Sequence, residues 1–453
     1  MAKREGKAVE ARIRRDRRLL GFLRALASAA GRAGGAAYLA GGWLRDVVDG
    51  KPGGDVDVMV AGLLHGKLGE ALSTLPAERL GIRKVVPAGR HFPVYRVATS
   101  WGAKYVDVAA ARGDGRAKGW GPFACALADA ARRDFTINSM LYELFPSPKG
   151  LRGELVDSFG GAADLARRTI RCVGFPEDRL REDPVRALRA IRMKNERRRY
   201  RIDPATFAAI RRLGPKLLPG VPADRLAGEL VRSFQANPRG TFDDLLRSGI
   251  LRAILPELIR KRYGAQRARR RYAALARACP APIPAAILLS NLLLDLPPGK
   301  AEAAARRLRF PGIRKILSTV LDLRLLRNPS RLRHPLARTE AILARQEAPE
   351  PFIALYRAAA ACDGARPTDL KRFLIRCTNT PVFIDGIDLT RIGFPAGPER
   401  EETLLAVREA SLEGKVKDRE AALKMIRATR EKTRAARKKM SGAGPAPKGV
   451  RAR

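Results

Sequence analysis

The sequence predicts an α+β protein in which a small mixed sheet near the N-terminus precedes an elongated all-helical remainder. From about residue 37 to residue 145, short strand-like runs alternate with helical ones. After residue 160 strand signals nearly vanish, and Leu, Ala and Arg recur at helical spacing as far as residue 439. This change of pattern predicts a sheet-containing head and a separate helical part. Proline and glycine divide the helical part near residues 214–222, 295–300, 328–335 and 393–398.

The first 36 residues are basic and then partly apolar, beginning "MAKREGKAVEARIRRDRRLLGFLRALASAAG". Arg24 interrupts the apolar part, and no uninterrupted signal-peptide core precedes a small-residue cleavage site. We therefore expect residues 1–36 to form a basic amphipathic helix. An organelle transit peptide is the weaker alternative.

The head contains four strand-like runs and two helical ones. The strand-like runs are "AAYLAGG", "GGDVDVMVAG", "FPVYRVATS" and "KYVDVAAA", and the helical runs are "LHGKLGEALSTL" and "RDFTINSMLYEL". The second helical pattern makes four apolar side chains available for the core, namely Phe135, Ile137, Met140 and Leu141.

The charge of the chain indicates a polyanionic partner. Lys and Arg total 89 against 46 Asp and Glu, which gives a formal net charge of +43. An enzyme of small neutral metabolites has no need for that excess, whereas nucleic acid is attracted by it. An anionic membrane surface is the weaker alternative, and a basic surface kept only for solubility is weaker still.

The cysteines and histidines exclude several classes of site. Five cysteines are widely spread without a CxxC pair, which favours a reducing, cytoplasmic compartment over a disulfide framework or a zinc knuckle. Three histidines make a histidine-rich metal centre a poor interpretation. The longest apolar stretch, "PAAILLSNLLL", is too short to span a bilayer, so we expect no membrane partner.

Asp55 and Asp57 lie in the run "GGDVDVMV" at residues 53–60. Because side chains alternate across a strand, both carboxylates point to the same face, where like charges repel. A solvated strand edge is the simpler interpretation of such a pair. The sharper one is a metal site, in which a divalent cation supplies the missing positive charge.

A glycine-rich turn just upstream favours the metal interpretation. The run "YLAGGWLRDVV" predicts a strand, a tight turn and a helix. Gly42 in that turn lets a phosphate approach the backbone, and Arg45 on the first helical turn adds a guanidinium fork. A triphosphate with magnesium needs the oxygen ligands and the anion donors that these residues offer together.

Two further elements extend the site. Asp107, in the strand-like run "KYVDVAAAR", either completes the metal or base function or is a surface strand residue. In "ARRDFTINSMLYEL", Arg132 and Arg133 suit a second clamp on the nucleotide, while Asp134 is explained by helix capping alone.

The run "REDPVRALRAIRM" predicts a helix that begins at Asp183-Pro184. Arg186, Arg189 and Arg192 step by three and drift only slowly around one face, as in a salt-bridged surface. A sharper hypothesis concerns base choice. Cytosine and adenine present an amino donor beside a ring-nitrogen acceptor; ionised Asp183 only accepts and Arg186 only donates, so the pair selects C and A over G and U.

With these motifs in their order, the chain resembles the class II tRNA nucleotidyltransferases and bacterial poly(A) polymerases. The similarity runs through GGxxRD and DxD, then RRDFTIN, then "VDSFGGAADL" at 156–165, then EDxxR with LRAxR. It continues more weakly through "DRLAGEL", "LLRSGILRAILPEL" and residues 388–427. After Arg192 the chain departs from the family pattern with "MKNERRRYRIDP".

The resemblance implies a polymerase-beta-like nucleotidyltransferase head and helical neck, body and tail that hold RNA. It implies Asp55 and Asp57 as ligands of Mg²⁺, and Gly42, Arg45 and Arg133 as nucleotide contacts. Asp183, Arg186, Arg189 and Arg192 would form the base-selecting template and its support. The implied domains are an extension (1–36), head (37–145), neck (146–200), body (201–330), tail (331–439) and a disordered basic terminus (440–453).

Three functions remain open from the sequence. The first is addition of C and A from CTP and ATP to the 3′ end of tRNA, in full or in part, which "GRHFPVY" at 89–95 and "AGPEREETLLAVREASLEG" favour. The second is a poly(A) polymerase, which Ser139 and the basic terminus favour. The third is an inactive RNA-binding relative, against which the intact metal and template residues argue. We expect no DNA substrate, and the sequence leaves the oligomeric state open.

Overall fold

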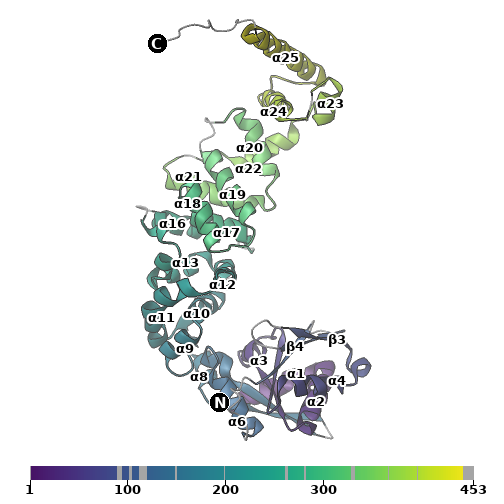
Figure 1. Cartoon of the computed structure of the whole chain (residues 1–453), viewed down its shortest axis with the longest axis vertical. Coiled ribbons are helices and arrows are strands. Elements are labelled where there is room, and N and C mark those ends of the chain that lie inside the picture. Colours follow the sequence, from purple (N-terminus) through teal and green to yellow (C-terminus); the bar gives the residue numbers. More distant parts are fainter. Residues whose placement is uncertain are drawn as a thin grey trace, which may run out of the picture. The chain divides into compact units, whose positions relative to one another are not determined.

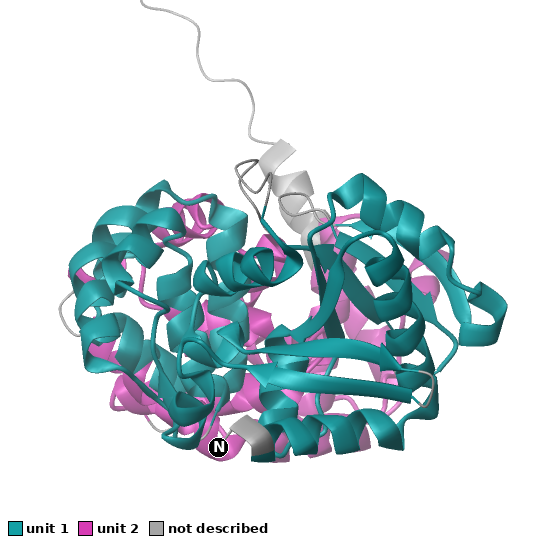
Figure 2. Cartoon of the chain, turned by 90° about the horizontal axis from the view of Figure 1, so that it is seen from below, with its two compact units in different colours: residues 1–256 teal, residues 257–453 magenta. Residues whose placement is uncertain are grey.

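The chain forms two compact units, residues 1–256 and residues 257–453 (Figure 2). The computed structural model describes residues 2–88, 94–101, 105–111, 120–147, 150–197, 199–260, 264–279, 282–327, 332–365, 367–394 and 396–441. The predicted "GRHFPVY" motif and residues 442–453 of the predicted basic terminus therefore fall wholly or largely outside the described residues.

Unit 1 contains a seven-stranded mixed sheet in the order β3-β4-β5-β2-β1-β6-β7. β2 and β5 pair in parallel, and the other neighbours pair antiparallel. This sheet confirms the predicted α+β class. Its strands are β1 (Ala36–Ala40), β2 (Val56–Ala61), β3 (Ile82–Ala88), β4 (Val94–Thr99), β5 (Tyr105–Ala110), β6 (Leu141–Ser147) and β7 (Gly150–Val156).

The N-terminal segment forms two helices rather than the single one predicted, α1 (Ala2–Arg15) and α2 (Arg17–Arg32). Asp16 divides them because its carboxylate accepts hydrogen bonds from the first backbone N–H groups of α2. α1 packs against β7 and α2 against β6. Phe22, Leu23 and Leu26 are fully buried there, so the two helices belong to the core of the head.

The predicted helix "RDFTINSMLYEL" is wrong over most of its length. Only α7 (Thr136–Ser139) is helical, and β6 begins at Leu141. β6 pairs with β1 on one side and β7 on the other, and these ladders override the local helical pattern. Phe135, Ile137, Met140 and Leu141 are buried as predicted. The sheet therefore extends past residue 145, as far as Val156.

Helices complete unit 1 around the sheet and beyond it (Figure 1). They are α3 (Gly41–Val48), α4 (His65–Ser73), α5 (Ala77–Leu80), α6 (Pro122–Ala131), α8 (Gly161–Ala166), α9 (Pro176–Glu182), α10 (Arg186–Glu196), α11 (Pro204–Leu217), α12 (Ala223–Ala236), α13 (Pro238–Arg247) and α14 (Ile250–Ile254). Two short strands, β8 (Thr169–Ile170) and β9 (Arg201–Ile202), pair in parallel. α10 packs against α12, which positions the predicted base-selecting helix.

Unit 2 is helical throughout its described residues, as the sequence predicts. After α15 (Pro256–Arg260), which crosses the boundary between the units, its helices are α16 (Gly264–Ala278), α17 (Ala285–Leu293), α18 (Pro298–Arg307), α19 (Ile313–Arg327), α20 (Pro335–Ala344), α21 (Pro349–Cys362), α22 (Leu370–Asn379), α23 (Gly386–Arg391), α24 (Pro398–Leu412) and α25 (Arg419–Ser441). α25 includes Met440, where the sequence predicted disorder. No helix among the described residues is long and apolar enough to cross a bilayer.

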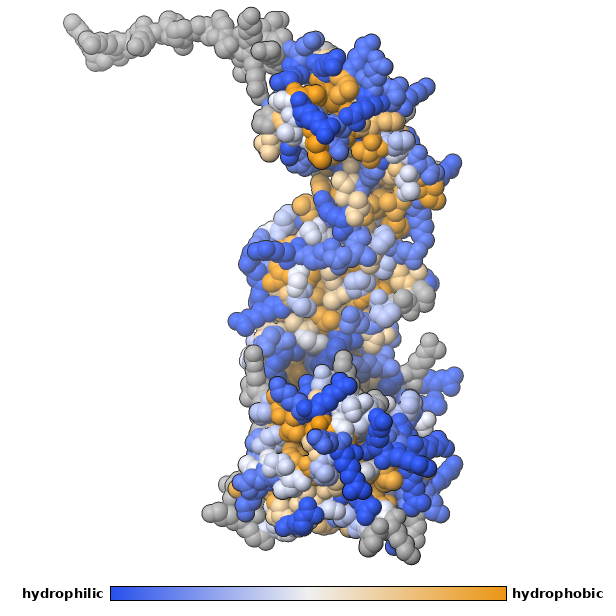
Figure 3. All heavy atoms as spheres, turned by 90° about the vertical axis from the view of Figure 1, so that its right-hand side faces the viewer, coloured by the Kyte–Doolittle hydropathy of each residue, from blue (hydrophilic) through white to orange (hydrophobic). Residues whose placement is uncertain are grey.

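The surface is rich in hydrophilic side chains. On the face drawn in Figure 3 they surround smaller hydrophobic patches. This coverage agrees with a chain of which 30% is charged. Contact with a polyanion would use such a surface through phosphate contacts.

Removing a side chain from the α2 core tests whether the N-terminal helices belong to the folding unit of the head. Phe22→Ala should lower the free energy of unfolding by about 3–5 kcal/mol, because a fully buried ring is replaced by a cavity. Urea denaturation measures this, with the exposed Arg17→Ala in the same helix as the control. Equal stability of the two variants would show that α1 and α2 do not belong to the folding unit of the head.

Candidate active site

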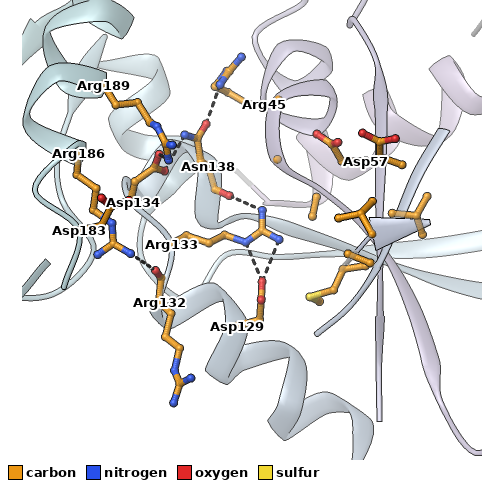
Figure 4. Close-up of a pocket in the computed structure, with 18 of the residues that line it drawn as sticks. Arg45, Asp57, Asp129, Arg132, Arg133, Asp134, Asn138, Asp183, Arg186 and Arg189 are labelled. Atoms are coloured by element: carbon orange, nitrogen blue, oxygen red, sulfur yellow. Dashed lines mark hydrogen bonds and ion pairs between the residues drawn. The ribbon is translucent and has the colours of Figure 1, made fainter. Parts of the chain in front are cut away.

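A pocket of about 740 Å³ lies in unit 1 between the sheet and the helices that follow it (Figure 4). The β1–α3 turn, β2 and β5 form one wall, which carries Asp57 and Asp107. The opposite wall comes from the turn after α6 and from the segment between α9 and α10. Predicted site residues from both sides therefore meet in one pocket, namely Gly42, Arg45, Asp57, Asp107, Arg133, Asp183, Arg186 and Arg189.

Gly41, the first residue after β1, makes room for the Asp57 carboxylate. β1 ends at Ala40 and α3 begins at Gly41 without an intervening loop. Gly41 has φ +70°, and a Cβ there would lie 2.8 Å from Oδ2 of Asp57. Any other residue would be strained and would also collide with the carboxylate. The backbone N–H of Gly42 donates a hydrogen bond to Asp57.

Asp57 and Asp107 lie side by side on neighbouring strands. The parallel register of β2 and β5 places Asp57 opposite Asp107. Burial and the charge of Asp107 raise the pKa of Asp57 to about 6, although Arg133 and the Gly42 N–H oppose the shift. Burial and the neighbouring acid therefore outweigh the positive charge of Arg133 at the Asp57 carboxylate.

Asp55 occupies a different position from the one predicted for a strand residue. It precedes β2, is exposed, and is not among the residues that line the pocket. Its negative charge still acts on Asp57 and raises its pKa. The sequence correctly placed the two aspartates near each other, but only Asp57 lies on the strand.

The carboxylates fit a divalent cation that takes further ligands from a bound molecule. No group of three or more His, Cys, Asp or Glu side chains with metal-binding geometry occurs in the described parts of the chain. The donor set is oxygen only, which suits Mg²⁺, and Mg²⁺ usually keeps water and phosphate ligands beside one or two carboxylates. A cation bound there would offset the acidic charges that help to raise the pKa of Asp57.

The turn between α6 and α7 connects the two walls of the pocket. Arg133 forms an ion pair with Asp129 and donates to the carbonyl oxygen of Asn138. The Asn138 side chain accepts a hydrogen bond from Arg45 at 2.7 Å and donates one to Asp134 at 2.9 Å. Figure 4 shows this chain of contacts from Arg45 across the turn.

Asp134 fastens this turn to α10. Its Oδ2 accepts a hydrogen bond from Arg189 at 3.0 Å, and its Oδ1 accepts from the N–H of Phe135. Burial alone would raise the pKa of Asp134, but Arg189 and the hydrogen bonds lower it instead. Asp134 thus remains ionised and anchors α10 through Arg189, a larger role than the predicted helix cap.

Asp183 and Arg186 lie together in the pocket, and both have partners. Asp183 accepts a hydrogen bond from the N–H of Val185, as predicted for a residue at the helix start. Both of its carboxylate oxygens also accept from Nη2 of Arg225 on α12. Arg186 is buried and donates to Glu182 and to the carbonyl oxygens of Arg179 and Arg132. Its guanidinium is therefore held rigidly at the pocket wall.

The arginine stripe of α10 divides between two places. Arg186 and Arg189 line the large pocket, whereas Arg192 pairs with Glu229 and Glu196. Arg192 lines a second, smaller pocket of about 250 Å³. In this conformation its contacts tie α10 to α12.

Sequence reasoning missed three residues of the site: Asp129, Asn138 and Arg225. Asn138 lies within the RRDFTIN motif, and Arg225 lies within "DRLAGEL", so both motifs contained the signal. Asp129 lies in an alanine-rich helix that gave no signal, and its partner Arg133 becomes apparent only in three dimensions.

Two family matches cover most of the regions that build this pocket, but not the segment of α9 and α10 with Asp183, Arg186 and Arg189, which lies between them. Residues 37–171 match the Poly A polymerase head domain. Residues 199–261 match the "Probable RNA and SrmB- binding site of polymerase A". Residues 37–171 and 199–261 of the chain therefore belong to the poly(A) polymerase family.

Curated relatives of this chain carry two different names. It is 32% identical over 246 residues to poly(A) polymerase I of Salmonella typhi, covering 51% of this chain and 48% of the relative. It is 34% identical over 230 residues to the multifunctional CCA protein of Xanthomonas campestris pv. campestris, covering 49% and 51%. The chain thus spans about half the length of the curated relatives that it matches.

Solved structures with this fold include several CCA-adding enzymes. A CCA-adding enzyme in complex with CTP has a TM-score of 0.72 at 23% identity, over 94% of this chain and 98% of that one. The Thermotoga maritima CCA-adding enzyme complexed with tRNA has a TM-score of 0.68 at 23% identity, over 91% and 96%. These matches establish the fold of the nucleotidyltransferase.

The raised pKa of Asp57 predicts a pH-dependent stability of the metal-free protein. The folded carboxylate binds its proton more tightly than the unfolded one, so ionised Asp57 destabilises the fold above about pH 6 and this penalty fades toward pH 4. Asp57→Asn should raise the free energy of unfolding by about 1–3 kcal/mol at pH 8 and little at pH 4. Thermal or urea unfolding in EDTA measures this. The exposed Asp224→Asn on α12 is the control, and an equal gain for Asp57→Asn at both pH values would contradict the account.

Proposed function

We propose that this nucleotidyltransferase adds C and A nucleotides from CTP and ATP to the 3′ end of tRNA, as all or part of CCA addition. The observation that carries the proposal is that one pocket contains both the acidic strand residues and a hydrogen-bond acceptor and donor for a base. Asp57 and Asp107 belong to the sheet, and Asp183 and Arg186 flank the start of α10. RNA, rather than DNA, is the expected substrate.

The strand carboxylates act on the reacting phosphate. Asp55 and Asp57 would hold Mg²⁺, which when bound offsets the charge of the triphosphate and of the attacking oxygen. The RNA 3′-oxygen forms a bond to the α-phosphorus while the bond to the bridging oxygen breaks and pyrophosphate leaves. Asp107, beside Asp57, either completes the ligand set or accepts the proton of the 3′-hydroxyl.

The glycine turn and two arginines hold the triphosphate. Gly42 leaves the backbone open at the start of α3, while Arg45 and Arg133 line the pocket. Both guanidinium groups already donate to protein oxygens, Arg45 to Asp46 and Asn138, and Arg133 to Asp129. These partners fix the direction of each fork, which is the preorganisation that phosphate binding needs.

Asp183 and Arg186 select the base by its hydrogen-bonding edge. The carboxylate accepts from the amino group of cytosine or adenine, and the guanidinium donates to the adjacent ring nitrogen. Both oxygens of Asp183 already accept from Arg225, so the base either shares the carboxylate with this arginine or displaces it. Arg189 supports the arrangement through Asp134, and Arg192 supports α10 from the other side.

Poly(A) addition is the second candidate, because one of the relatives is named a poly(A) polymerase. Ser139 gives it less support than its sequence position suggested. Its side chain is buried and donates to the carbonyl oxygen of Thr136, so it closes the α7 turn instead of lining the pocket. An inactive RNA-binding relative is disfavoured because two acidic strand residues, Asp57 and Asp107, line the same pocket as Asp183, Arg186 and Arg189.

A primer-extension assay separates these functions. A tRNA that ends before its CCA should gain C, C and A from CTP plus ATP and then stop, whereas oligo(A) should gain little from ATP alone. Asp57→Ala should abolish addition while leaving tRNA affinity nearly unchanged, because phosphate contacts elsewhere supply most of the binding. Long ladders on oligo(A) without C addition to tRNA would instead establish the poly(A) activity.

Substitution of Asp183 tests the base-selecting pair. Asp183→Ala should reduce the preference for C and A over G and U by about 1–3 kcal/mol, the value of a well-paired base edge. Competition between the four nucleotides in single-turnover addition measures the preference. Arg225→Ala is the matched control, because it breaks the same ion pair but keeps the carboxylate. Unchanged ranking in Asp183→Ala would reduce this residue to a helix cap.

A further inference from the structure

Arg96, Asp107 and Asp57 occupy one line across three neighbouring strands. The register of β4 and β5 places Arg96 opposite Asp107, and the register of β5 and β2 places Asp107 opposite Asp57. Residues directly opposite each other on paired strands carry their side chains on the same face of the sheet. One positive charge therefore lies next to the two acidic residues that line the pocket.

The guanidinium of Arg96 engages both oxygens of Asp107. Its Nε and Nη2 donate to Oδ1 and Oδ2, each at 2.8 Å. The guanidinium also lies 5.4 Å from the ring centroid of Tyr105, the diagonal neighbour on β5. This bidentate geometry is stronger and more directional than an ordinary surface ion pair.

The pair is nevertheless accessible to competitors. The side chains of Arg96 and Asp107 are 48% and 26% exposed. Exposed ion pairs contribute little to stability in water, so a divalent cation with a phosphate ligand can displace one. In the described parts of the chain, no comparable guanidinium fork binds Asp57, although Arg133 acts on it electrostatically.

We propose that Arg96 is a built-in counter-ion that competes with the divalent cation for Asp107 and so makes metal binding depend on the nucleotide. The inference rests on the proposed function, in which the carboxylates beside Asp57 act through magnesium. A cation that uses an oxygen of Asp107 has to break the guanidinium fork first. A triphosphate favours this exchange, because its oxygens add ligands for the cation and its charge attracts the released arginine.

Binding of Mn²⁺ to the full-length, nucleotide-free protein tests the inference, with free Mn²⁺ measured by electron paramagnetic resonance. Arg96→Gln should tighten Mn²⁺ binding by about two- to tenfold, because the competing fork is gone. Arg96→Lys keeps the charge but loses the fork, so its Kd should lie between the two. Arg83→Gln on β3, two strands from β5, removes the same charge and should leave the Kd within about twofold of wild type.

A double-substitution cycle links the effect to Asp107. In an Asp107→Asn background, Arg96→Gln should no longer tighten Mn²⁺ binding. Unchanged or weaker binding in both Arg96 variants would overturn the inference and would mean that Arg96 only stabilises the strand pair. If wild-type binding instead survives Asp57→Asn unchanged, the metal site of the proposed function is itself refuted. Adding a non-hydrolysable CTP analogue should shrink the difference between Arg96→Gln and wild type.

Discussion

The buried carboxylate of Asp134 is the contact on which the pocket depends. It binds Arg189 of α10 on one side and the backbone and Asn138 of its own turn on the other. The same turn supplies the carbonyl oxygens of Ala131 and Arg132, which accept from Arg179 and Arg186. Breaking a buried ion pair by removing one partner typically costs about 3–5 kcal/mol. The turn and α10 are therefore held together as one wall, and Asn138, which accepts a hydrogen bond from Arg45 of α3, joins this wall to the other side of the pocket.

Local charge in the pocket differs from that of the whole chain. The chain carries a formal charge of +43, yet five arginines of the pocket have acidic partners, namely Arg45, Arg133, Arg186, Arg189 and Arg225. A nucleotide therefore exchanges existing contacts instead of filling an unneutralised positive pocket. Such exchange lowers the affinity for stray anions and favours a ligand that satisfies several groups together. The Asp57 carboxylate is the exception, because its nearest strand neighbour is another acid.

Local patterns predicted the site better than they predicted its supports. The glycine turn, Asp57 and the Asp183 helix start follow from short-range rules of strands, turns and caps, and the structure places them as those rules require. The helical pattern after Arg133 failed because β6 pairs with strands that are distant in sequence. Arg192 shares the helical stripe of Arg186 and Arg189, but it forms an ion pair with Glu229 of α12 and does not line the large pocket. Partners separated by tens of residues carry no local signal, and those partners decide which arginines face the pocket.

The most direct test of the account is a crystal structure with Mn²⁺ and a non-hydrolysable CTP analogue, in which anomalous scattering locates the metal. The account predicts an anomalous peak at about 2.0–2.2 Å from an oxygen of Asp57, with the triphosphate near Arg45 and Arg133. The cytosine edge should face Asp183 and Arg186. A metal peak away from Asp57, or a base that lies outside this pocket, would contradict the account.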